Sequence, residues 1–127
     1  FQLGEDEMEI GMGIHGEPGV QRGKLARAET IADAMLDRLL ADAPLGSGDR
    51  AFVLVNSLGA TPVEELYILY RRVADRIGAL GATIARPLVG RYATSMEMTG
   101  ASLTLMRLDA ELEQLLAAPA HCAFWHV

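Results

Sequence analysis

The chain is poor in cysteine, in aromatic residues and in positive charge. Its one cysteine, Cys122, cannot form an internal disulfide, so we expect a fold that needs none and a reducing, cytoplasmic setting. Lys and Arg number 11 against 17 Asp and Glu, which gives a formal net charge of −6. Phosphate backbones repel such a chain, so nucleic acid is not an expected partner. The uncharged stretch 51–62 is too short to cross a bilayer, which argues against a membrane-spanning segment.

What is present is ordinary globular composition, with 50% hydrophobic and 22% charged residues over 127 positions. That length predicts a single domain, 1–127, able to bury a core of its own. The chain begins at Phe1 without an initiator methionine, and its first residues read as an ordered segment. We therefore expect a piece of a longer polypeptide, in which a site shared with the rest would be incomplete.

Four stretches have the pattern of strands. Met8, Ile10, Met12 and Ile14 alternate with charged residues or glycine, as on a strand with one buried face. The continuous apolar run 51–55 predicts a central strand buried on both faces. A third strand is expected over 83–89, where Pro87 indicates an edge position or a bulge. Alternation over 101–108 predicts the fourth strand.

Three segments have the pattern of helices. Apolar residues recur every three or four positions over 24–41, which predicts an amphipathic helix. A second helix is expected from Thr61, with Thr61 as N-cap, Pro62 at the first helical position and Glu64 completing a capping box. Asp109 is expected to be the N-cap of a short third helix.

The predicted order is strand, helix, strand, helix, strand, strand, helix. This order indicates an α/β fold in which helices flank a small mixed β-sheet. Because 82–108 supplies two strands with no helix between them, a purely parallel sheet is not expected.

His15 is the first candidate for chemistry. It follows an apolar strand and lies between Gly13 and Gly16, which lack side chains and let a ligand or backbone approach closely. Ligands of α/β sheets bind beyond strand ends, where an imidazole here would face them. The structural alternative is a loop histidine that bonds a nearby backbone group.

Other candidates are weaker. The segment 56–62 could present backbone N–H groups to an anion, but it lacks the glycine spacing or lysine of a phosphate loop, and a tight turn is favoured. Ser95 and Glu97 form no nucleophile–base pair without a histidine, so 94–100 is also interpreted as a turn. His121, Cys122 and His126 match no zinc spacing, and we expect a docked terminal segment and no metal site.

Taken together, three ordered motifs resemble the dihydroxyacetone kinase family. They are the segments DEMEIGMGIHGEPG (6–19), LVNSLGATPVEELY (54–67) and TSMEMTG (94–100), followed by AAP (117–119). The resemblance covers nearly the whole chain, and the combination of motifs in this order is specific.

The resemblance implies that this chain is the C-terminal half of a dihydroxyacetone-binding subunit or domain. It implies that His15 adds through a ring nitrogen to the ketone carbon of dihydroxyacetone, forming a covalent hemiaminal, with Gly13 and Gly16 beside the substrate. The family's acid/base aspartate belongs to an N-terminal half that this chain lacks. ATP or ADP with magnesium would lie on a partner subunit or domain, with no cofactor in this chain.

The resemblance further implies a homodimer and a kinase whose phosphoryl donor is a phosphotransferase-system protein, with direct use of ATP left open. The fragment alone is expected to be inactive. Two other functions remain open: a non-catalytic relative that senses dihydroxyacetone or acts as a co-regulator, and a kinase for a larger ketose such as erythrulose.

Overall fold

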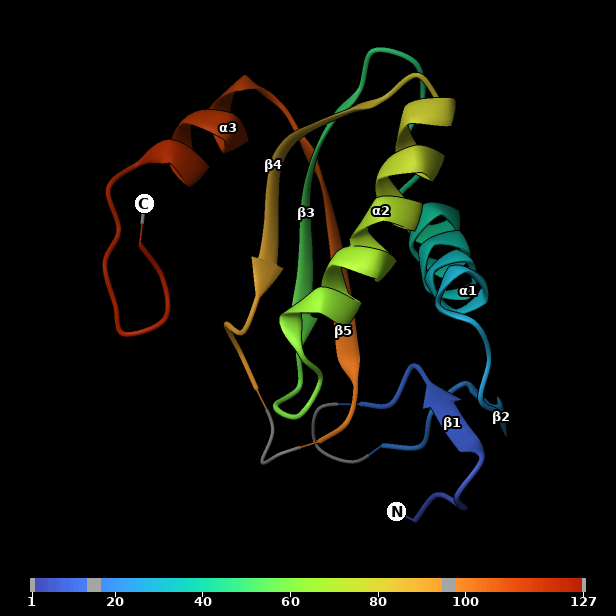
Figure 1. Ribbon diagram of the computed structural model, residues 1–127. Coiled ribbons are helices and arrows are strands. Elements are labelled where there is room, and N and C mark those ends of the chain that lie inside the picture. Colours follow the sequence, from blue (N-terminus) through green and yellow to red (C-terminus); the bar gives the residue numbers. More distant parts are fainter. Residues whose placement is uncertain (1, 14–16, 95–97, 127) are drawn as a thin grey trace.

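The computed structural model describes residues 2–13, 17–94 and 98–126, and its ribbon is drawn in Figure 1. A two-stranded hairpin comes first, and a three-stranded sheet with helices follows it. The elements in chain order are β1 (Glu7–Ile10), β2 (Gln21–Lys24), α1 (Ala28–Asp42), β3 (Arg50–Ser57), α2 (Val63–Ala79), β4 (Thr83–Gly90), β5 (Ala101–Leu108) and α3 (Ala110–Ala117).

The larger sheet has the strand order β4-β3-β5. β4 runs parallel to β3, whereas β5 runs antiparallel to it. The predicted mixed sheet flanked by helices is therefore confirmed. The two strands that follow each other in the sequence do not pair, because the buried strand β3 lies between them.

Strand β4 has the irregularity that its proline indicated. It is an edge strand, and its register with β3 shifts between Ala51 and Phe52, whose partners are Ile84 and Arg86. Pro87 lies opposite Val53 just after this shift. A proline has no N–H to donate to the ladder, and an edge strand tolerates that loss.

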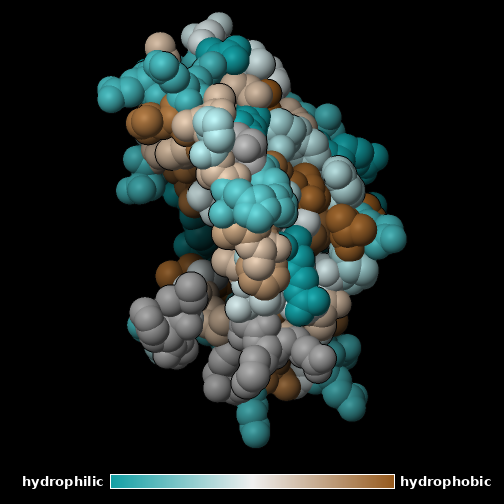
Figure 2. All heavy atoms as spheres, turned by 90° about the vertical axis from the view of Figure 1, so that its left-hand side faces the viewer, coloured by the Kyte–Doolittle hydropathy of each residue, from teal (hydrophilic) through white to brown (hydrophobic). Residues whose placement is uncertain are grey.

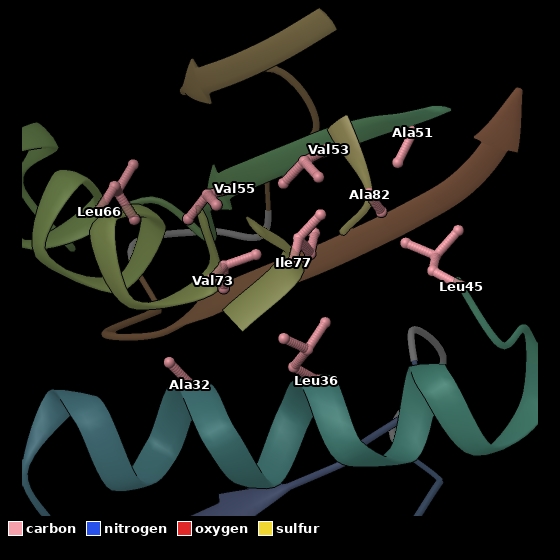
Figure 3. Packing of buried hydrophobic residues seen from close by; sticks show 10 residues of the cluster. All are labelled: Ala32, Leu36, Leu45, Ala51, Val53, Val55, Leu66, Val73, Ile77 and Ala82. Carbon is pink, nitrogen blue, oxygen red and sulfur yellow. The ribbon is translucent and has the colours of Figure 1, made fainter. Parts of the chain in front are cut away.

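The hydrophobic core lies between the sheet and the pair α1 and α2, which cover one face of it (Figures 1 and 3). Alternate residues of β3 point into this layer, and leucine, valine and isoleucine side chains of the helices close it from the other side. The buried cluster comprises Ala32, Leu36, Leu45, Ala51, Val53, Val55, Leu66, Val73, Ile77 and Ala82. Phe52, which points to the opposite face, is also buried, so the central strand is covered on both sides as predicted.

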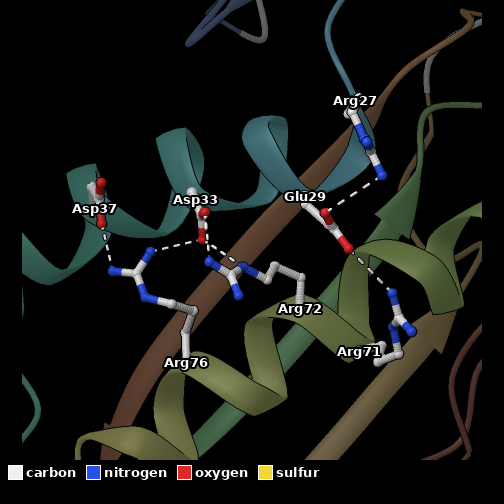
Figure 4. A network of polar contacts seen from close by, with 7 residues as sticks. All are labelled: Arg27, Glu29, Asp33, Asp37, Arg71, Arg72 and Arg76. Atoms are coloured by element: carbon white, nitrogen blue, oxygen red, sulfur yellow. Dashed lines mark hydrogen bonds and ion pairs between the residues drawn. The ribbon is translucent and has the colours of Figure 1, made fainter.

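Helices α1 and α2 are joined by ion pairs along their exposed seam (Figure 4). Asp33 accepts two hydrogen bonds from Arg72, at 2.9 and 2.8 Å, and one from Arg76, at 2.7 Å. Arg76 also reaches Asp37 at 2.7 Å, and Arg71 lies 3.4 Å from Glu29 on the same seam. The hydrogen bonds from the two arginines hold the pKa of Asp33 at about 2, below its usual 3.8.

The N-terminal segment differs from the prediction. Its strand belongs to a separate two-stranded sheet, where β1 pairs antiparallel with β2. The structure places β2 over Gln21–Lys24, a strand that the sequence pattern did not predict, and α1 consequently begins at Ala28 and not at residue 24. All four residues of β2 are exposed, so they leave no alternation for a pattern to detect.

The two predicted helix caps have opposite outcomes. The Asp109 side chain accepts a hydrogen bond from the Leu112 N–H at 2.8 Å, so this N-cap is confirmed. The capping box at Thr61 is wrong: α2 begins at Val63, Pro62 occupies the N-cap position, and no side chain caps this helix. The Thr61 hydroxyl instead donates to the Gly100 carbonyl, at 2.8 Å.

Helix α3 and the tail that follows it, residues 118–126, lie away from α1 and α2, on the side of β4 (Figure 1). Arg86 donates to the Leu116 carbonyl at 2.8 Å, and Arg50 makes an ion pair with Glu113. On that side of the molecule hydrophobic residues are scattered among hydrophilic ones (Figure 2). No helix within the described residues is long and apolar enough to span a membrane.

Candidate functional site

The loop between β1 and β2 is closed by two backbone hydrogen bonds. The Val20 N–H donates to the Ile10 carbonyl at 2.9 Å, and the Gly13 N–H donates to the Glu17 carbonyl at 3.0 Å. The Gly19 N–H donates to the Glu9 carboxylate, which joins the loop to β1. The base of this loop is thus fixed on both sides of its middle residues. The predicted site residues His15 and Gly16 belong to that middle part and lie outside the described residues.

Gly13, the third predicted site residue, occupies a place where only glycine fits. A Cβ at this position would lie 2.1 Å from Glu17 Oε2 and 2.7 Å from Glu17 Cβ. Gly19 is similarly confined, because a Cβ there would lie 2.7 Å from the Ile10 carbonyl oxygen. Gly11 has φ of +77°, a left-handed conformation that side chains disfavour. Three glycines of this loop are therefore explained by close contacts at Gly13 and Gly19 and by the left-handed backbone at Gly11.

An ion pair strengthens the hairpin on its exposed side. Arg22 of β2 donates to the Glu7 carboxylate of β1 at 2.5 Å. This hydrogen bond, together with one from the Gly4 N–H, lowers the pKa of Glu7. The hairpin and the loop after β3 lie at the same end of the larger sheet (Figure 1). This is the end at which the parallel strands β3 and β4 finish, where α/β sheets bind ligands.

The loop after β3 has no free backbone donors for an anion at its centre. The Leu58 N–H donates to the Gly100 carbonyl at 3.0 Å, and the Ala60 N–H donates to the Met98 carbonyl at 3.1 Å. The Gly59 N–H is bonded to the Ser57 hydroxyl at 3.2 Å. With these three groups occupied, the centre of this segment is a tight turn whose N–H groups are not available to an anion.

Asn56 is an organising residue that the sequence reasoning missed. It is 2% exposed, and its Oδ1 accepts from the Tyr92 N–H at 2.8 Å and the Ala93 N–H at 3.0 Å. Its Nδ2 donates to the Ala93 carbonyl at 2.5 Å and to the Ser102 hydroxyl at 3.2 Å. One amide thus joins the central strand to the turn that follows β4 and to β5. The only sequence signal was a polar residue directly after an apolar run.

The 94–100 segment is attached to the loop after β3. Gly59 and Met98 form an isolated parallel bridge, and Gly100 accepts from both Leu58 and Thr61. Two of the three sequence motifs are therefore brought side by side. Ser95 and Glu97 themselves lie outside the described residues, so the interpretation of this pair as part of a turn stays a prediction.

The C-terminal tail folds back on itself. His121 and His126 form an antiparallel bridge, and the Cys122 N–H donates to the Trp125 carbonyl at 2.8 Å. The Trp125 ring meets the Tyr92 ring edge-on, with centroids 5.8 Å apart, while Cys122 is exposed. The tail is docked through this aromatic contact and is otherwise largely exposed. Among the described residues no three metal-ligating side chains gather in one place.

Comparison with known proteins identifies the family. A family model described as the Dak1 domain matches residues 1–124. The chain is 46% identical over 127 residues to a protein of Listeria innocua named PTS-dependent dihydroxyacetone kinase 2, dihydroxyacetone-binding subunit DhaK. It is also 42% identical over 123 residues to an L-erythrulose 1-kinase of Mycolicibacterium smegmatis. It covers 38% of the first relative and 22% of the second, so it spans well under half of either.

Solved structures agree. A dihydroxyacetone kinase operon co-activator, DhaQ, superposes with a TM-score of 0.84 at 34% identity over 94% of this chain and 38% of its own. The dihydroxyacetone kinase of C. freundii in complex with AMP-PNP and Mg2+ superposes with a TM-score of 0.70 at 32% identity. That match covers 91% of this chain and 21% of the kinase. The family resemblance seen in the three motifs is confirmed.

Proposed function

This chain belongs to the Dak1 domain family, and on that premise we propose that it is the C-terminal half of a dihydroxyacetone-binding subunit or domain of a kinase. Residues 1–127 form one domain in this proposal, and the substrate site is completed by the part of the subunit that lies outside this chain. The name of the Listeria relative, which is longer than this chain, supports the proposal. The kinase activity belongs to the complete assembly.

His15 is the residue that captures the substrate in this proposal. The observation that carries it is the tightly closed hairpin loop: the Gly13–Glu17 hydrogen bond of 3.0 Å and the absence of room for a Cβ at Gly13. Between these two residues the sequence has His15 and Gly16. A short, rigidly based loop limits the motion of a nucleophile, and precise orientation supplies much of the acceleration of an enzymatic reaction.

The covalent step is an addition. A ring nitrogen of neutral His15 donates its lone pair to the ketone carbon, so one N–C bond forms and the carbonyl π bond breaks. The ketone oxygen takes up the proton that the imidazole gives up, and no other product leaves. Imidazole has an ordinary pKa of about 6.5, so the nucleophilic form is available near neutrality. Glycerol has no carbonyl, so this step would reject a polyol of nearly the same shape.

The nucleotide is assigned to another subunit or domain. The loop after β3 is the candidate phosphate cradle of the sequence, and its N–H groups at Leu58, Gly59 and Ala60 are all bonded within the protein. These residues do not fit a nucleotide. ATP or ADP with magnesium would lie on a partner subunit or domain, and the kinase solved with AMP-PNP and Mg2+ is much longer than this chain.

Three further assignments follow from the relatives and belong to the same proposal. The phosphoryl donor is a phosphotransferase-system protein, as the name of the Listeria relative suggests for that protein. The subunit is a homodimer, so sedimentation of the complete protein in the analytical ultracentrifuge should give the mass of two chains. Its setting is the cytoplasm, where the exposed thiol of Cys122 would stay reduced.

Intact-protein mass spectrometry of the full-length protein with dihydroxyacetone tests the proposal. We expect a mass increase equal to one dihydroxyacetone per chain, which is absent in His15→Ala. His121→Ala is the matched control, because it removes another histidine of the same chain and should retain the adduct. Glycerol should give no adduct with any variant. A fully active protein without an adduct, or an adduct that persists in His15→Ala, would refute the assignment.

Two other functions are supported by particular relatives. The superposition on the co-activator favours a non-catalytic sensor, which would bind dihydroxyacetone but transfer no phosphate when all kinase components are present. The identity to the L-erythrulose 1-kinase favours a larger ketose. Measuring phosphate transfer to dihydroxyacetone and to erythrulose in the reconstituted system separates the three functions. A sensor transfers phosphate to neither ketone, a dihydroxyacetone kinase mainly to dihydroxyacetone, and a kinase for a larger ketose mainly to erythrulose.

A further inference from the structure

The C-terminal tail places two imidazoles beside each other. His121 and His126 are directly opposite each other in an antiparallel bridge, so their side chains lie on the same side of the tail. Their ring centroids are 4.5 Å apart, with an angle of 66° between the ring planes. Both residues are exposed, so an ion from solution can reach them.

We propose that His121 and His126 form a two-histidine binding site for a divalent transition-metal ion of the zinc type. Two imidazoles held at ~2.0–2.1 Å from one tetrahedral zinc ion have ring centres roughly 5 Å apart. The observed separation of 4.5 Å needs only a small side-chain rotation to match. Imidazole nitrogen is a preferred ligand of zinc, nickel and copper, whereas magnesium and calcium prefer oxygen.

The tail is ordered by contacts that do not need the metal. The Cys122 N–H bonded to the Trp125 carbonyl closes the turn between the two histidines. The Trp125 ring rests against Tyr92, which follows strand β4. The pair is therefore held before any ion binds, and this lowers the entropic cost of binding.

Cys122 is not a member of the proposed site. Adjacent residues of an extended segment point to opposite sides, so the thiol and the His121 ring diverge. This agrees with the lack, in the part of the chain that the structure describes, of any group of three metal-ligating side chains. Two positions of a tetrahedral ion are then left to water, which makes the site open and the ion exchangeable.

Isothermal titration of the full-length protein with zinc chloride tests this proposal, with magnesium chloride as the control ion. We expect one zinc ion per chain and no magnesium. Loss of an outer-shell partner alone weakens metal sites by about 10–100-fold. His121→Ala and His126→Ala, which each remove a ligand, should therefore lose at least about tenfold in affinity.

Two matched variants make the result specific. His15→Ala removes the remaining histidine of the three in the chain, and Cys122→Ser removes the thiol; both should keep the affinity of the unmodified protein. Circular dichroism checks that each variant is folded. The proposal is overturned if zinc does not bind, if His121→Ala and His126→Ala bind it unchanged, or if Cys122→Ser or His15→Ala weakens it as much as they do.

Discussion

The amide of Asn56 offers the sharpest test of how the fold holds the candidate site. It is buried, and it satisfies the Tyr92 N–H, the Ala93 N–H and the Ala93 carbonyl at once. Asn56→Ala removes all of these contacts and leaves the three backbone groups without their partner. We expect a substantial loss of stability, because an unsatisfied buried polar group is costly.

The size of the effect follows from the surroundings of those three groups. Each unsatisfied buried group costs about 1–3 kcal/mol, and water can replace part of the loss at Ala93, which is exposed. The free energy of unfolding should therefore fall by about 2–4 kcal/mol. With a slope of about 2 kcal/mol per molar urea, the unfolding midpoint should fall by about 1–2 M. Ser102→Ala, which removes only the 3.2 Å contact, should cost about 1 kcal/mol or less.

A second variant at the same position checks the direction of the hydrogen bonds. In Asn56→Asp both acceptor contacts remain, but a carboxylate oxygen replaces the amide N–H groups that face the Ala93 carbonyl at 2.5 Å. Protonation restores a donor, so the pKa of the introduced carboxyl is raised in the folded state. This variant should be most stable below the unfolded pKa and should lose stability as pH rises through the folded pKa.

Urea unfolding followed by circular dichroism measures both variants. The reasoning is refuted if Asn56→Ala unfolds within about 0.5 kcal/mol of the unmodified protein, the range of ordinary surface substitutions. It is also refuted if Asn56→Asp becomes more stable as pH rises from 4 to 7.

Three further predictions concern the seam, the core and the hairpin. Asp33→Asn should reduce stability above pH 4 and have progressively less effect as pH falls towards 2, because the pKa of Asp33 is about 2 in the folded protein against 3.8 ordinarily. Urea unfolding of both proteins across this pH range measures the difference in the free energy of unfolding. A difference that does not change with pH would contradict this prediction. Ile77→Ala should lower the free energy of unfolding by about 2–5 kcal/mol, because this side chain is fully buried. Leu115→Ala, at a side chain that is 62% exposed, should lower it by less than about 0.5 kcal/mol. Equal effects would show that the core is misassigned. Gly13→Ala should abolish the dihydroxyacetone adduct while the core stays folded, because its Cβ would lie 2.7 Å from the Cβ of Glu17; full adduct yield would show that this loop is not as tight as described.

The central part of the fold could be predicted because its signal is strong and local. The run 51–55 has no polar residue, and such a run is stable as a strand only when both faces are covered. Asp109 combines a good capping side chain with an apolar segment after it. Pro87 restricts its strand to an edge or an irregular place, and the structure has both.

The predictions that were wrong concern segments whose structure depends on residues far away in the sequence. Thr61 has the sequence of a helix cap, but its hydroxyl bonds to Gly100, 39 residues away. Strand β2 (Gln21–Lys24) is stabilised by its pairing with β1 and by the Arg22–Glu7 ion pair, not by any apolar face of its own. A pattern within one segment cannot contain either interaction.

The candidate site also has residues that the sequence could indicate and residues that it could not. Gly13 was singled out from the sequence, and the close approach of Glu17 explains why a side chain is excluded there. Asn56 was not singled out as a clamp, because its partners lie 36 to 46 residues further along the chain. From the sequence the tail histidines were expected in a docked terminal segment and not in a metal site, because only the bridge between them brings the rings together.

The most direct test of the central claim is the bond between a histidine nitrogen and the substrate. Dihydroxyacetone labelled with 13C at the ketone carbon is added to the full-length protein labelled with 15N in histidine. We predict a bound tetrahedral carbon that shows a one-bond coupling to nitrogen, and its loss in His15→Ala. A bound ligand that keeps its carbonyl resonance, or a tetrahedral carbon without coupling to nitrogen, would contradict the account.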